Sequence, residues 1–205
     1  LEKKRDSFIL SKGHAAPSLY AVLEDSKIIN KNLFLSDKTY WHPEKSIRGV
    51  DFQTGALGHG LSTGIGIAKY YKKNHINKWV VVMLGDGELN EGSVWESFLI
   101  SKNWKLGNLI IIIDENKFQA NDKTQKILNL GSLEKKILSF DLKLIKVNGH
   151  NFENMNNKFS NLKKDNIPKV IIARTKRNFG IPSIQNKKEY WYVDKTEKQL
   201  KQFRV

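Results

Sequence analysis

Oxygen-bearing side chains follow two apolar runs of strand length, and their types suit metal chemistry. Asp86 lies just after the run Trp79–Leu84, between Gly85 and Gly87, and Asn116 follows the run Leu109–Ile113, 30 residues after Asp86. The carboxyl ends of parallel strands meet at one edge of a sheet, so the two side chains converge there if the strands are neighbours. A carboxylate and a carboxamide suit a hard divalent cation, best Mg²⁺ and alternatively Ca²⁺.

Gly87 adapts the same sheet edge to a phosphate group. A glycine at the start of a helix lets the backbone approach a phosphate and aims amide donors at it. Magnesium keeps few protein ligands and completes its octahedron with phosphate oxygens and water. Gly85-Asp86-Gly87 alone is typical of a tight turn. Its place after an apolar strand, with Asn116 after the next one, instead predicts a Mg²⁺-bridged diphosphate.

Apolar runs alternate with helical patterns along the chain. The predicted strands lie within 5–12, 79–84, 109–113, 142–147 and 170–173. Helices are expected over about 16–25, from the glycine-dense segment 55–66 to Lys73, over 93–104, and near Leu133 and Met155. This alternation predicts an α/β domain whose doubly wound parallel sheet carries helices on both faces.

Length and composition indicate one domain of the soluble class. The 205 residues suffice for one α/β domain over 1–175, and the pattern breaks at Lys176, so we expect a tail or linker over 176–205. The sequence has no cysteine, which excludes disulfides and thiolate chemistry. No apolar run approaches the ~20 residues of a membrane span, and no signal peptide opens the chain. We expect a cytoplasmic protein without membrane contact.

The formal net charge of +14 raises the question of an anionic partner. Of the 35 basic residues only 5 are arginine, and the lysines are spread along the chain beside 19 asparagines. A nucleic-acid-binding protein more often concentrates arginine in a stripe. A compositional bias that produces a solvated surface is therefore favoured, and no nucleic acid is expected as a partner. An anionic substrate or partner is the alternative.

Four motifs, in the same order, resemble the thiamine diphosphate-binding half of transketolases. They are Arg5–Ala15, His42-Pro43-Glu44, Thr54–Ser62, and Gly85–Gly92 followed by Asp114-Glu115-Asn116. The resemblance covers Arg5 to about Thr175. It implies the diphosphate-binding domain of the thiamine diphosphate-binding fold. The stretch 91–96 looks most like the family branch that is split into two separate subunits.

The resemblance implies a set of metal and diphosphate contacts. Asp86 and Asn116 look like the metal ligands, joined by the backbone carbonyl of Phe118. Gly87 and His14 look like diphosphate contacts. For His14, a hydrogen bond at the start of a helix is the structural alternative.

The resemblance also implies contacts to the rest of the cofactor, to the substrate and to a partner. Gly55 looks like the backbone contact to the aminopyrimidine, and Leu57 like a residue that packs on the cofactor. His42 looks like the histidine that handles substrate hydroxyls; together with His14 it would exchange protons with oxygens that change charge. Glu91 looks like the glutamate that meets the partner half at a dimer interface. The structural alternatives are that His42 is simply a loop residue and that Glu91 caps the helix that follows it.

Three features depart from the family pattern, and one helix face is ambiguous. The chain lacks the family's opening segment and its pyrimidine-binding half, and Trp191-Tyr192 stands where the family has Trp-His. A tyrosine donates a hydrogen bond but carries no positive charge near neutrality. Gly60, Gly64 and Ala68 form a small-residue face at helical spacing, which suits either core packing or a subunit contact.

These observations favour the N-terminal subunit or fragment of a transketolase-like transferase. It would move a two-carbon ketol unit from a ketose or ketose phosphate donor to an aldose acceptor, using thiamine diphosphate and Mg²⁺. It would be active only in a homo- or hetero-oligomer that contains a pyrimidine-binding half. Tyr192 motivates one alternative, a thiamine diphosphate enzyme of specialised metabolism with a different donor. The positive charge motivates another, a non-catalytic fragment that binds only a partner.

Overall fold

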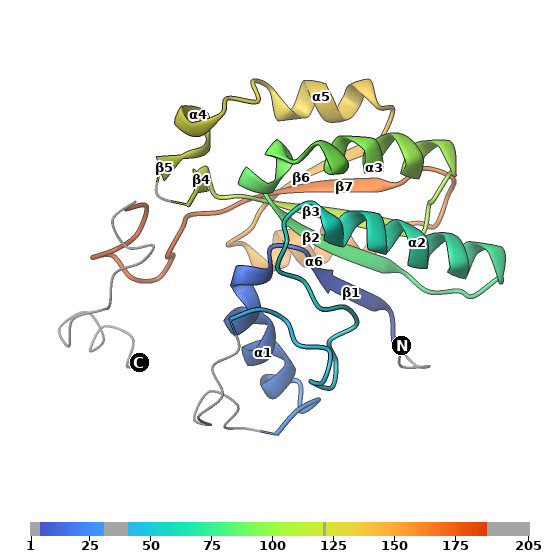
Figure 1. Cartoon of the computed structure of the whole chain (residues 1–205), viewed down its shortest axis with the longest axis horizontal. Helices are drawn as coiled ribbons and strands as arrows, with labels where there is room; N and C mark the ends of the chain where they lie inside the picture. Colours follow the sequence, from blue (N-terminus) through green and yellow to red (C-terminus); the bar gives the residue numbers. More distant parts are fainter. Residues whose placement is uncertain (1–4, 31–40, 121, 188–205) are drawn as a thin grey trace.

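A five-stranded parallel sheet forms the centre of the molecule, as predicted (Figure 1). The computed structural model describes residues 5–30, 41–120 and 122–187. The strands are arranged in the order β1-β2-β3-β7-β6. Their bounds are β1 Ser7–Leu10, β2 Val80–Gly85, β3 Leu109–Glu115, β6 Lys143–Asn148 and β7 Lys169–Arg174.

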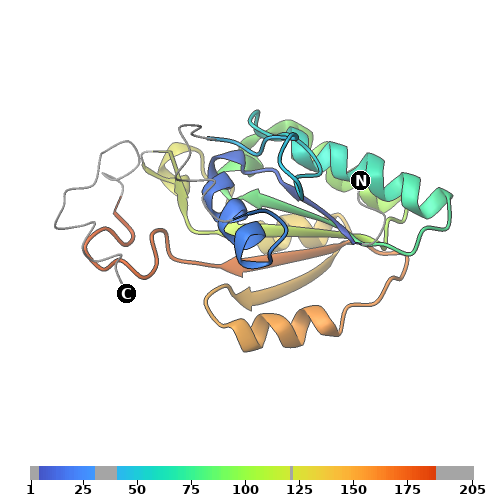
Figure 2. The same ribbon diagram turned by 90° about the horizontal axis from the view of Figure 1, so that it is seen from below.

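Helices cover both faces of the sheet, which confirms the doubly wound architecture. On one face lie α2 (His59–Lys73), α3 (Gly92–Asn103) and α5 (Leu133–Ser139), and on the other lies α6 (Phe152–Ser160) (Figures 1 and 2). The predicted helix over 16–25 is α1 (Ala16–Asp25), which packs on the loop residues Ile47 and Val50. No helix among the described residues is both long and apolar enough to cross a membrane.

Short elements near the strand ends were not predicted. They are the 3₁₀ turns η1 (Gly13–Ala15) and η3 (Gly87–Asn90), the antiparallel pair β4 (Phe118–Gln119) and β5 (Asp122–Lys123), and α4 (Thr124–Ile127). Elements of two to four residues carry no hydrophobic period that sequence patterns could reveal.

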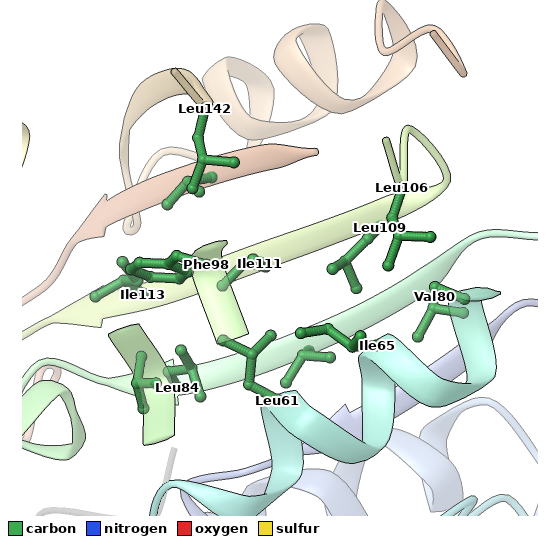
Figure 3. Packing of buried hydrophobic residues seen from close by; sticks show 14 of the residues in the cluster. Leu61, Ile65, Val80, Leu84, Phe98, Leu106, Leu109, Ile111, Ile113 and Leu142 are labelled. Carbon is green, nitrogen blue, oxygen red and sulfur yellow. The ribbon is translucent and has the colours of Figure 1, made fainter. Parts of the chain in front are cut away.

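The core explains why the central strands are apolar throughout. In β3, Ile111 and Ile113 pack under α2 and α3 (Figure 3). Ile110 packs on the other face of the sheet, toward α6. A strand buried on both faces has no polar side to show, so period-two alternation is absent. The register pairs Gly85 of β2 with Asp114 of β3. That pairing makes the two strands neighbours and brings their carboxyl ends to one edge.

The small-residue face of α2 packs inside this chain. A Cβ atom at Gly64 would lie 2.4 Å from Cγ2 of Val82, and one at Gly60 would lie 2.3 Å from Oγ of Ser11. Ala68, on the same face, is fully buried. Of the two alternatives that the sequence left open, core packing is therefore correct for these three positions.

We expect Gly64→Ala to destabilise the protein by about 1–3 kcal/mol, because the added methyl group overpacks the contact with β2. Gly66 is the matched control, since a Cβ there meets nothing within 4 Å. Gly66→Ala should be neutral or stabilise by up to ~1 kcal/mol through helix propensity. Urea unfolding measures both changes, and equal effects would contradict this packing account.

Candidate functional site

A cavity of about 590 Å³ opens at the carboxyl edge of the sheet. Segments that follow four strands contribute to its wall, through Lys12 after β1, Asp86 after β2, Asn116 after β3 and Thr175 after β7. Open parallel sheets bind ligands at this edge. The cavity therefore lies where the sequence predicted a site.

Asp86 lies buried in the cavity wall with both carboxylate oxygens bonded to backbone amides. Oδ1 accepts a hydrogen bond of 2.8 Å from the amide of Gly87, and Oδ2 accepts one of 2.6 Å from the amide of Lys117. Burial nevertheless raises the pKa of Asp86 to about 7, and the nearby charge of Asp114 contributes in the same direction. Burial disfavours the ionised form of this carboxylate, and a cation bound beside it would stabilise that form.

Asn116 is held in one orientation beside Asp86. Its Oδ1 accepts a hydrogen bond of 2.8 Å from the amide of Phe118, and its Nδ2 donates one of 3.1 Å to Oδ2 of Asp114. Lys117, between Asn116 and Phe118, donates its amide to Asp86. The three predicted metal-binding positions thus lie in linked segments.

The donor chemistry fits a cation that keeps other ligands. The described residues contain no group of three or more His, Asp or Glu side chains placed to hold a metal. A divalent ion beside Asp86 would therefore depend on neutral amide and carbonyl oxygens and on the oxygens of a bound ligand. Magnesium bound through a phosphate has this preference.

Gly87 leaves room that any side chain would fill. A Cβ atom there would lie 2.8 Å from Cβ of Gln119. Gly87 begins η3, directly after Asp86, and lines the cavity. The close approach of the Gln119 segment requires glycine here and leaves the backbone of this turn accessible from the cavity.

Basic groups gather at the rim of the cavity. Arg177 donates from Nη1 to the carbonyl of Ala120 over 2.9 Å, and its guanidinium lies 5.4 Å from the centroid of the Phe118 ring. Lys176 also lines the cavity. Acidic and basic groups therefore line the same cavity, an arrangement that suits a metal–anion complex.

His14 also lines the cavity, in the turn η1. Its side chain reaches solvent, but the surrounding protein lowers its pKa to about 4; burial is the largest cause, followed by the charges of Lys12, His42 and Arg177. His14 is therefore neutral at pH 7 and can both donate and accept a hydrogen bond.

His42 lies beside two glycines of the site. Its Cδ2 would be 2.9 Å from a Cβ at Gly13 and 3.7 Å from a Cβ at Gly55. Tyr20 fixes the loop by donating from its hydroxyl to the carbonyl of His42 over 2.8 Å and accepting from the amide of Glu44. The imidazole of His42 is exposed, and it lies close enough to His14 to lower the pKa of His14.

Comparison with known proteins identifies the family and the fold. The sequence matches the family described as "Transketolase, thiamine diphosphate binding domain" over residues 2–204. The chain belongs to this family. It is 34% identical over 199 residues to an apulose-4-phosphate transketolase subunit of Actinobacillus succinogenes, covering 93% of this chain and 71% of that protein. It is 37% identical over 196 residues to transketolase of Homo sapiens, covering 91% of this chain and 30% of that protein.

Solved transketolases have the same architecture. The structure of transketolase from Pichia stipitis in complex with sedoheptulose-7-phosphate superposes with a TM-score of 0.84 at 26% identity, covering 98% of this chain and 32% of that chain. The chain spans about two thirds of the length of the apulose-4-phosphate transketolase subunits and about a third of the transketolases it matches. The expected fold and family resemblance are confirmed.

Within this transketolase domain, Leu57 and Glu91 flank Gly58 in space. Leu57 lines the cavity. Glu91 is exposed at the start of α3, and its Cβ would be 2.7 Å from a Cβ at Gly58. The side chain of Glu91 makes no capping hydrogen bond, so the capping alternative is not supported. Its role at a subunit contact stays a prediction, and Tyr192 lies outside the described residues.

Glu88, a buried carboxylate that organises the transketolase site, was not predicted from the sequence. Glu88 is 2% exposed and accepts hydrogen bonds from the Ser11 hydroxyl and from the amides of Gly58 and Gly85. Burial raises its pKa despite these bonds. It thereby ties the ends of β1 and β2 to the loop before α2. The only available signal was an acidic residue within a turn between apolar segments.

Proposed function

We propose that this chain is the diphosphate-binding part of a thiamine diphosphate-dependent transferase that moves a two-carbon ketol unit from a ketose or ketose phosphate to an aldose. The observation that carries the proposal is the convergence of Asp86, Gly87 and Asn116 on one cavity with a cationic rim. An intact site of this kind favours an enzyme over a fragment that only binds a partner.

The residues present fit the cofactor and a divalent ion. Asp86, Asn116 and the carbonyl of Phe118 would hold Mg²⁺ or Ca²⁺, while Gly87 and His14 would contact the diphosphate. When bound, thiamine diphosphate supplies carbanion stabilisation for C–C bond cleavage and formation. The protein contributes position and electrostatics. The ion would anchor the diphosphate.

Two further positions would hold the organic part of the cofactor. The backbone of Gly55 would contact the aminopyrimidine, and Leu57, in the cavity wall, would pack against the cofactor. Gly55 is exposed, so its backbone is open to a second half. The apulose-4-phosphate transketolase relatives are named as subunits of an assembly. We therefore propose a pyrimidine-binding half as the partner, met in part by Glu91.

His42 and His14 would handle the protons of substrate oxygens. The pKa of His14, lowered to about 4 chiefly by burial, keeps that imidazole uncharged at pH 7. With so low a pKa His14 is a weak base, so it would orient substrate oxygens by donating and accepting hydrogen bonds, and the proton transfer would depend chiefly on His42. The imidazole of His42 is exposed and lies near His14, which lines the cavity, so it would be within reach of a substrate bound there.

We expect His42→Asn to lower kcat/KM by roughly 100-fold, the usual contribution of a proton-transferring group. The affinity for thiamine diphosphate should stay within about twofold, because the metal and diphosphate contacts are untouched. His75→Asn is the matched control, since His75 is exposed at the opposite edge of the sheet. Equal kinetics for the two variants would remove His42 from the site.

The proposal is tested by titrating thiamine diphosphate into the enzyme assembled with its pyrimidine-binding half. Isothermal titration calorimetry with Mg²⁺ should give tight binding, and excess EDTA should weaken it by on the order of 100-fold because the diphosphate charge is no longer neutralised. Affinity that is the same with and without the metal would refute the proposed site.

A further inference from the structure

Two carboxylates, not one, lie at the ends of the central strands. Gly85 is the register partner of Asp114, and the amide of Asp86 donates to the carbonyl of Asp114 over 3.1 Å. The charge of Asp114 is felt at the Asp86 carboxyl. Two carboxylates whose charges interact favour a divalent cation more strongly than one carboxylate does.

Lys12 makes Asp114 unavailable as a metal ligand. Its Nζ lies 2.5 Å from Oδ2 of Asp114, and the two side chains are only 9% and 11% exposed. Asn116 donates its amide to the same oxygen, and the hydroxyl of Thr175 donates to Oδ1. Both oxygens of Asp114 are therefore engaged inside the protein. Asp86 accepts one backbone amide on each oxygen and, among the described residues, forms no ion pair with a lysine, so it is the carboxylate that can face a metal.

The charges in the cavity then favour joint binding. Asp86, Glu88 and Asp114 carry three negative charges when ionised and Lys12 one positive charge, so a divalent ion would already neutralise this group. Arg177 and Lys176, which also line the cavity, would then leave the whole site with a net positive charge. In a partly buried site such an excess is unfavourable. A diphosphate bound beside the ion would offset it.

We infer that Lys12 makes metal binding conditional on the diphosphate, because it occupies Asp114 and leaves too little negative charge for the ion alone. This inference rests on the proposed function and adds a positioning residue to it. The metal and the cofactor would enter or leave together, so the site would hold no divalent ion without the cofactor.

The test is a Mn²⁺ titration of the assembled enzyme, in which electron paramagnetic resonance counts the free ion. For the parent protein, thiamine diphosphate should tighten Mn²⁺ binding by on the order of 100-fold. For Lys12→Met, Mn²⁺ alone should bind at least ~10-fold more tightly than to the parent, because Asp114 becomes available as a ligand. The enhancement by thiamine diphosphate should shrink accordingly.

Three further variants isolate the cause. Lys12→Arg keeps the positive charge and should behave like the parent. Lys12→Met/Asp114→Asn should return Mn²⁺ alone to weak binding, since the second carboxylate is gone. Lys12→Gln keeps a hydrogen-bond donor for Asp114 without the charge, and it replaces Lys12→Met if that variant does not fold.

The outcomes separate this inference from the proposed function. Parent protein that shows no coupling between Mn²⁺ and thiamine diphosphate would contradict both. Coupling in the parent, with affinity for Mn²⁺ alone unchanged in Lys12→Met and Lys12→Gln, would overturn the role of Lys12 and leave the proposed function standing. If Mn²⁺ alone still bound more tightly to Lys12→Met/Asp114→Asn than to the parent, the role of Lys12 would also be overturned, because the tighter binding would not depend on Asp114.

Discussion

Replacing Asp86 by asparagine should abolish Mg²⁺-dependent binding of thiamine diphosphate and at the same time stabilise the metal-free protein. The expected loss of affinity is at least on the order of 100-fold, because the ion loses its only charged protein ligand. The stabilisation follows from the pKa of Asp86, which burial raises from 3.8 to about 7. One substitution should therefore move binding and stability in opposite directions.

The sign of the stability effect depends on pH. A raised pKa means that the folded state holds the proton more tightly than the unfolded state, so stability falls as pH rises from about 4 to about 7. Above pH 7 the ionised carboxylate costs roughly 4 kcal/mol at 1.36 kcal/mol per pKa unit. Asparagine carries no charge, but its Nδ2 cannot accept the second backbone amide, which costs about 1–3 kcal/mol at any pH. Relative to the parent, the variant should therefore be more stable at pH 8 than at pH 4, by up to the cost of the charge.

Urea unfolding in EDTA at pH 4 and pH 8 measures the effect. Asp141→Asn is the matched control, because the Asp141 side chain is 83% exposed and its substitution should change stability similarly at both pH values. A change in stability for Asp86→Asn that is equal at pH 4 and pH 8 would contradict the assigned environment of this carboxyl group.

The purified 205-residue chain should catalyse almost no ketol transfer, and addition of a pyrimidine-binding half should raise the rate by at least ~10³-fold. In the proposed function, the cavity of this chain would supply positions for the metal and the diphosphate. The activation of the cofactor and the grip on a sugar phosphate are expected from the second half. Without it, the cofactor would be neither enclosed nor aligned with a substrate.

The measurement is a ketol-transfer assay with the two halves separately and mixed. A mixture that contains Asp86→Asn should stay inactive, which shows that the gain depends on this site. Full turnover by the chain alone would contradict the division of labour between the halves.

The parts of the fold that follow from local patterns were predictable from the sequence. The runs that contain Val82, Ile111 and Ile171 are apolar because each strand is buried between two layers of helices. Strand neighbours at one sheet edge then bring Asp86 and Asn116 together, as expected from their place after the strands.

The buried charges were not predictable from local patterns. Lys12 and Glu88 would by type be expected at the surface. Their partners Asp114 and Ser11 lie 102 and 77 residues away in the sequence. Only the assembled sheet brings these pairs together. The strand pair β4–β5 was not predicted for a different reason: strands of two residues are too short to show an alternation of apolar and polar residues.

The most direct test of the central claim is a crystal structure of the assembled enzyme with Mn²⁺ and thiamine diphosphate, in which anomalous scattering locates the metal. We expect one manganese peak at roughly 2.0–2.3 Å from a carboxylate oxygen of Asp86 and from Oδ1 of Asn116, with the diphosphate against Gly87 and His14. Manganese and diphosphate bound away from the ends of β2 and β3 would contradict it.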